Sequence, residues 1–113
     1  MAKNVMEVEL PVPYTWEATG EEISSAVIRM LKVGEQMELA KKFPNRSKIG
    51  ELMVETMRRR LVRLGSFEAP VDMALIEEMP APDFDYLVDA AEALDRGFES
   101  VEEYRASDQY QGG

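Results

Sequence analysis

Residues 29 to 43 read RMLKVGEQMELAKKF, an amphipathic segment with Gly34 in its middle. A glycine inside a helix costs stability, whereas at a junction between a strand and a helix its missing side chain costs nothing. The fold class therefore depends on whether the residues before Gly34 form a helix or a strand.

Two interpretations are open for the preceding segment, ISSAVIRML at 23–31. Local signals favour a helix, because Thr19 and Glu22 can form a capping box and the apolar residues have helical spacing. As a strand, the same segment gives the alternating segment before it a partner for its backbone groups. The sequence shows no other strand candidate. We therefore favour a β-hairpin, with strands at about 5–17 and 23–31.

The alternating segment is the strongest local pattern in the chain. Every even position from 6 to 16 is apolar, whereas the odd positions are polar or proline. This period of two predicts an extended strand. Pro11 and Pro13 cannot donate hydrogen bonds to a neighbouring strand, so we expect this strand at a sheet edge or interrupted by a bulge. The even positions are Met6, Val8, Leu10, Val12, Tyr14 and Trp16.

The rest of the chain predicts helices. With 23–31 as a strand, Gly34 precedes a helix at about 35–43, and Pro44 ends this helix. We expect its inner face to contain Val33, Met37 and Ala40. Further helices are expected at about 47–64, 71–79 and 82–95.

One α+β domain over 1–97 is the resulting prediction, in which the N-terminal hairpin packs on about four helices. Residues 98–113 carry several acidic side chains and end in QYQGG without periodicity, so we expect a flexible, frayed acidic tail.

Composition excludes most catalytic chemistry. The 113 residues contain no histidine and no cysteine, and no phosphate-binding or nucleotide-binding glycine motif is present. We expect a protein that is not an enzyme and that has no cofactor. Asp85 and Asp89 lie four residues apart, but without a histidine beside them we read them as a solvated acidic face and assign no metal.

Charge is uneven along the chain. The formal net charge is −9, with −4 over residues 1–40, +6 over 41–63 and −11 over 64–113. An acidic protein is a poor general ligand for nucleic acid, so we expect none. The N-terminal residues do not look like a signal peptide, and no apolar run is long enough to span a membrane. We therefore expect a cytoplasmic protein.

Two clusters in the helix at 47–64 are candidates for partner binding. The basic cluster RRRLVR at 58–63 can be a solvated face, paired in part through Glu55 and Arg59, or it can contact an acidic partner surface. Methionines can be core residues or an adaptable apolar surface. The candidate partner-binding residues are Met53, Met57, Leu61, Leu64, Phe84, Leu87, Arg58, Arg59, Arg60 and Arg63.

The order of these parts resembles the small tail assembly chaperones of long-tailed phages, the E/41-type group. The stretch LKVGEQMELAKK at 31–42 is similar to that family's step from Val-Gly-Asp into its first helix. The stretch VDMALIEEMPAPDFDYLVDAAEAL at 71–94 is similar to its passage of spaced leucines, small residues and Asp-Phe. Glu35 replaces the family's commoner Asp, and Leu31-Lys32 replaces its usual proline.

The resemblance implies a non-enzymatic chaperone in the cytoplasm of an infected cell. Such a protein binds the tape-measure protein, keeps it soluble while tail-tube subunits gather, and can occur in a frameshifted longer form. Related proteins often form homo-oligomers. Two alternatives stay open from the residues: a small acidic inhibitor that mimics nucleic acid or occupies a basic groove of a host protein, and a DNA-binding module that uses 47–64.

Overall fold

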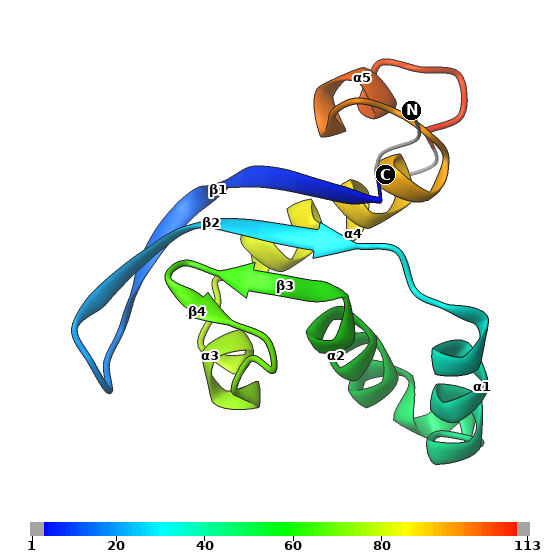
Figure 1. Ribbon diagram of the computed structural model, residues 1–113, viewed down its shortest axis with the longest axis horizontal. Helices are drawn as coiled ribbons and strands as arrows, with labels where there is room; N and C mark the ends of the chain where they lie inside the picture. Colours follow the sequence, from blue (N-terminus) through cyan, green and yellow to red (C-terminus); the bar gives the residue numbers. More distant parts are fainter. Residues whose placement is uncertain (1–3, 111–113) are drawn as a thin grey trace.

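The computed structural model describes residues 4–110, and Figure 1 shows their arrangement. Among these residues a four-stranded antiparallel sheet is combined with α-helices, which confirms the α+β class. The elements are β1 (Val5–Trp16), β2 (Glu21–Arg29), α1 (Val33–Lys42), the 3-10 turn η1 (Arg46–Lys48), α2 (Ile49–Arg60), β3 (Leu61–Leu64), β4 (Phe67–Glu68), α3 (Met73–Glu77), α4 (Ala81–Asp95) and α5 (Val101–Arg105).

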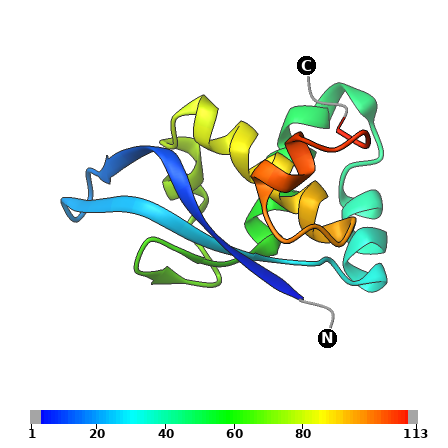
Figure 2. The same ribbon diagram turned by 90° about the horizontal axis from the view of Figure 1, so that it is seen from above.

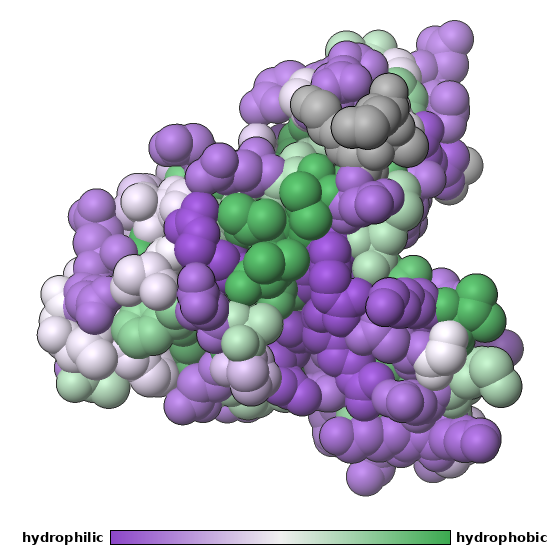
Figure 3. All heavy atoms as spheres, in the orientation of Figure 1, coloured by the Kyte–Doolittle hydropathy of each residue, from purple (hydrophilic) through white to green (hydrophobic). Residues whose placement is uncertain are grey.

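The sheet has the order β1-β2-β3-β4, and α4 packs across β1 and β2 on one of its faces. Figure 2 shows α4 and α5 on that side of the sheet, with α1 at one end of the molecule. The other face is open, and a hydrophobic patch lies over it in Figure 3. The core between sheet and helices contains the fully buried side chains of Ile23, Ile28, Leu61, Leu64, Leu75, Leu87 and Val101.

The hairpin prediction is confirmed, because β2 pairs with β1 in antiparallel register from Val5 opposite Arg29 to Trp16 opposite Glu21. The strand interpretation is therefore correct for 23–29, whereas Met30 and Leu31 lie beyond the end of β2. Both expectations for the prolines also hold: β1 lies at the sheet edge, and the register shifts between Glu9 and Tyr14.

A buried carboxylate holds the interrupted part of β1. Asp83, in the first turn of α4, is fully buried, and its Oδ1 accepts a hydrogen bond from the Val12 N–H at 2.8 Å. Burial raises the pKa of Asp83, and the hydrogen bond from Val12 opposes the rise. Nearby, the Tyr14 hydroxyl donates to the Leu75 carbonyl at 2.7 Å. These two bonds connect the bulge to α4 and α3.

The prediction of one helix over 47–64 is wrong at its C-terminal end. Helix α2 ends at Arg60, and Leu61–Leu64 form β3, which pairs with β2. Pairing with β2 satisfies the backbone groups of this segment and buries Leu61 and Leu64 together with the hairpin. After β3 the chain turns at Gly65, which has a φ of +60° and where an added Cβ would lie 2.7 Å from Cδ1 of Ile23.

The expected frayed tail over 98–113 is also corrected. Within it α5 forms, the Ser100 hydroxyl caps it by accepting from the Glu103 N–H at 3.1 Å, and Val101 and Tyr104 are buried. The apolar side chains inside an acidic segment thus find a surface on α4. Residues 111–113 lie outside the described residues. None of the helices in the described part of the chain combines the length and apolar character needed to cross a bilayer.

Replacing Asp83 tests the link between β1 and α4. Asp83→Ala removes the acceptor of the Val12 N–H in a part-buried hydrogen bond, so we expect the free energy of unfolding to fall by about 1–3 kcal/mol. Asp83→Asn keeps an acceptor oxygen and should lose less. Urea unfolding of both variants at neutral pH measures the difference, and an Asp83→Ala protein as stable as the wild type would contradict this role for the carboxylate.

Candidate functional site

The least buried part of the fold is the segment from α1 to the first half of α2, residues 33–54, which we call the arm. Leu39 is the one buried side chain in it. Figures 1 and 2 both show α1 at the edge of the molecule, away from α4. A helical segment of this length normally buries one stripe, so the arm presents surface that the rest of the described chain does not cover.

Exposed apolar side chains gather on the arm in two rows. On α1, Val33 is 72% exposed and Met37 is 58% exposed, one helical turn apart. On α2, Ile49 and Met53 repeat this spacing at 58% and 46%. Large apolar residues so exposed in regular helical rows are typical of surfaces that bind another protein. We call these two pairs the apolar rows.

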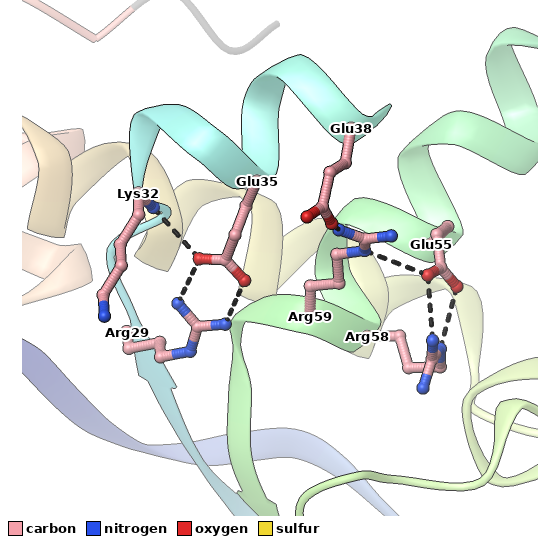
Figure 4. Close-up of polar contacts among 7 residues, drawn as sticks. All are labelled: Arg29, Lys32, Glu35, Glu38, Glu55, Arg58 and Arg59. Carbon is pink, nitrogen blue, oxygen red and sulfur yellow. Dashed lines mark hydrogen bonds and ion pairs between the residues drawn. The ribbon is translucent and has the colours of Figure 1, made fainter. Parts of the chain in front are cut away.

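Ion pairs attach α1 to the body of the molecule, as Figure 4 shows. The guanidinium of Arg29, at the end of β2, donates to both carboxylate oxygens of Glu35 at 2.7 and 2.6 Å. Oε1 of Glu35 also accepts from the Lys32 N–H at 3.0 Å, which caps the helix. One turn further on, Glu38 accepts from Arg59 of α2 at 2.7 Å.

A buried glutamate lies at the inner end of this network. Glu55 is 3% exposed, and it accepts two hydrogen bonds from Arg58 at 2.8 Å and one from Arg59 at 3.1 Å. The pairing of Glu55 with Arg59 expected from the sequence is confirmed. The hydrogen bond from Arg58 lowers the pKa of Glu55 to about 2, and the hydrogen bond from Arg29 lowers that of Glu35 to about 2.

The basic cluster at 58–63 is largely neutralised within the molecule. Besides the pairs of Arg58 and Arg59, Arg60 is 6% exposed and donates to both oxygens of Asp95 at 3.0 and 2.7 Å. Arg63 donates to Glu7 at 3.0 Å and to the Gly65 carbonyl. Each of these arginines therefore has an intramolecular carboxylate partner, and the structure supports the paired-face interpretation of the cluster.

Most of the apolar residues proposed from the sequence as a partner surface are core residues. Met57, Leu61, Leu64 and Leu87 are between 0% and 4% exposed, so in this structure a partner has no access to them. Phe84 is half-buried against the core. Of the six apolar candidates, Met53 is the one that is exposed, at 46%.

Sequence reasoning missed the surface that the structure exposes. It assigned Val33, Met37 and Ala40 to the inner face of the first helix, but all three are exposed. Leu39, on another side of α1, is the residue that packs. Helical spacing shows which residues of α1 share a face, but it does not show which face the rest of the chain covers.

Two grooves flank α2 beside the arm. One, of about 590 Å³, has Phe43, Val54 and Met73 among its lining residues. The other, of about 260 Å³, lies between α2 and α4, with Leu52 and Val88 in its walls. The first groove has both charged and apolar walls, whereas the second is largely apolar and includes Met53 of the apolar rows. The second groove can therefore accept an apolar side chain of a bound protein segment.

Of the acidic pair on α4, Asp89 is paired within the chain, whereas Asp85 is exposed. Oδ2 of Asp89 accepts from Arg105 at 2.8 Å and from the Tyr110 hydroxyl at 2.9 Å. No group of three or more potential metal-ligating side chains occurs among residues 4–110. We therefore base the candidate site on the arm and its grooves.

Acid unfolding tests the ion-pair network. A carboxyl whose folded pKa is about 2, below its usual 4.5, stabilises the fold above pH 4.5 and loses this contribution as the pH falls towards 2. We expect Glu55→Gln to be less stable at pH 7 and to lose less stability across that window than the wild type. Urea unfolding between pH 2 and 7 measures this, with Glu51→Gln as the control, because exposed Glu51 makes no ion pair with any described residue. An unchanged pH profile in Glu55→Gln would refute the assignment.

No family model, curated protein or solved structure matches the chain. The exposed rows, the grooves and the ion pairs of the arm are therefore the basis on which a function is proposed, since a fold alone does not specify one.

Proposed function

We propose that this chain is a non-enzymatic chaperone that binds the apolar helices of a client protein through the arm. The observation that carries the proposal is the pair of apolar rows, in which Val33, Met37, Ile49 and Met53 are 46% to 72% exposed. The resemblance to phage tail assembly chaperones names the client as the tape-measure protein and the place as the cytoplasm of an infected cell.

The arm has physical properties that suit a chaperone. A client that is released later must be bound without a large obligate interface, and two short rows beside shallow grooves offer limited apolar area. Methionines at two of the four positions can adapt to different apolar side chains. A net charge of −9 keeps the complex soluble.

A second candidate, the acidic inhibitor, is favoured by one observation. The acidic last third is folded, with α4 and α5 packed together and Asp85, Glu102 and Glu103 exposed on them. An inhibitor that occupies a basic groove needs such a rigid negative surface. It predicts that activity depends on these carboxylates, whereas the chaperone proposal predicts dependence on the apolar rows.

Polar substitution of the apolar rows tests the chaperone proposal. Val33→Ser, Met37→Ser, Ile49→Ser and Met53→Ser remove exposed apolar surface, so the combined variant should fold normally but fail to keep the co-expressed client soluble. The client is the very long helical protein that we expect to be encoded just downstream, and the assay is its soluble fraction and co-purification.

The matched control changes exposed valines outside the arm. Val5 and Val62 lie on β1 and β3 and are 48% and 37% exposed. Val5→Ser with Val62→Ser should leave client solubility unchanged. If the control abolishes client binding and the arm variant does not, the binding surface lies on the strands. If no client is solubilised by the wild type, and Asp85→Asn with Glu103→Gln abolishes inhibition of a host target, the second candidate replaces the first.

A further inference from the structure

The positive side chains of the described residues fall into two groups. Seven arginines form ion pairs with carboxylates of the same chain. The other cations make no ion pair within residues 4–110, and we call them the unpaired cations. They are Lys32, Lys41, Lys42, Arg46 and Lys48.

The unpaired cations all lie on or beside the arm. Lys32 precedes α1, Lys41 and Lys42 form its last turn, and Arg46 and Lys48 belong to η1. All five side chains are exposed. The same short region of the chain carries both apolar rows, so unpaired positive charge and exposed apolar surface coincide there.

The region that contains the unpaired cations belongs to a protein that is acidic as a whole. Residues 64–113 carry a net charge of −11. Lys41 and Lys42 also stabilise the C-terminal end of α1 through the helix dipole. Arg46 and Lys48, in η1, have no such structural role, because they lie outside α1 and make no ion pair with a described residue. Uncompensated surface charge is characteristic of surfaces that select a partner of opposite sign.

We propose that the arm binds an acidic amphipathic helix of its partner, with the partner's apolar stripe on the apolar rows and its carboxylates facing the unpaired cations. The inference rests on the proposed function, because it names the chemistry of the client segment that the chaperone selects. Helix-in-groove binding needs apolar side chains at helical spacing, which the rows match, and carboxylates beside that stripe complete the fit.

An acidic helix suits this surface better than a nucleic acid or a membrane. A long polyanion or an anionic bilayer would extend past the arm and meet the acidic last third, where repulsion opposes binding. The phosphates of a nucleic acid would also leave the apolar rows without a partner. A short acidic helix can contact the unpaired cations without reaching the acidic last third, and it covers the rows at the same time.

Two synthetic peptides test the proposal. Both form amphipathic helices with the same leucine stripe, but the flanking positions carry glutamate in one and lysine in the other. We expect the glutamate peptide to bind at least about tenfold more tightly at low ionic strength, and this ratio to shrink as salt screens the charges. Fluorescence anisotropy of labelled peptides measures both affinities.

A charge variant locates the binding. The variant neutralises four unpaired cations and should reduce the affinity for the glutamate peptide to that for the lysine peptide. Its substitutions are Lys41→Gln, Lys42→Gln, Arg46→Gln and Lys48→Gln.

A control makes the net charge more negative by the same amount at exposed positions away from the arm, and should keep the preference for the glutamate peptide. Its substitutions are Thr15→Glu, Ala18→Glu, Ala106→Glu and Gln109→Glu.

Three results of the binding measurements would overturn the inference: equal affinity for the two peptides, a charge variant that keeps the preference, or tighter binding to duplex DNA or phosphatidylserine vesicles than to the glutamate peptide. Measuring client solubility distinguishes a failure of this inference from a failure of the proposed function. If the wild type and the charge variant keep the client soluble equally well, the chaperone function stands and the inference fails. If the glutamate peptide binds at the arm but the client stays insoluble, the inference stands and the proposed function fails.

Discussion

The hydrogen bond from the Val12 N–H to the Asp83 carboxylate fixes the interrupted part of the edge strand β1 to the first turn of α4. Two prolines in β1 remove the donors that would pair this part of the strand, so the Val12 N–H needs an acceptor from elsewhere. Asp83 supplies it from the first turn of α4, inside the core. The bond thus adds a polar link to the apolar contacts of α4 with β1 and β2, and α5 in turn packs on α4.

The body and the arm are held together by different forces. In the body, apolar side chains of sheet and helices bury one another, which is the dominant stabilising term in most folds. In the arm, Leu39 is the one buried side chain, and α1 is joined to the body by the pairs Arg29–Glu35 and Arg59–Glu38. Fixing a helix by ion pairs leaves its apolar residues uncovered, and this is the physical origin of the surface that we assign to client binding.

Sequence reasoning succeeded where a pattern has one structural solution. Alternation over β1 predicted a strand, because no helix buries every second residue, and its prolines predicted that it lies at an edge or is interrupted. It failed at Leu61–Leu64, since the strand identity of LVRL comes from pairing with β2, a contact distant in sequence. The arm shows the same limit: Met53 and Met57 share one helical stripe, yet Met53 is exposed and Met57 is 4% exposed. Periodicity shows which residues share one face of a helix, but it does not show which of them the rest of the fold covers.

Helix α2 passes directly into β3, with Arg60 as its last residue and Leu61 as the first of the strand. Because no loop separates them, the backbone has no flexible joint at which the helix can swing relative to the sheet. The C-terminal half of α2, with buried Met57 and Arg60, is therefore joined directly to a strand of the core. Local unfolding that begins in the arm should end near Arg60. The backbone amide hydrogens of the arm should therefore exchange with solvent long before those of β3. The junction of α2 and β3 thus separates a segment with few buried contacts from the core, and under the function that we propose the core would not need to move when a client binds or leaves.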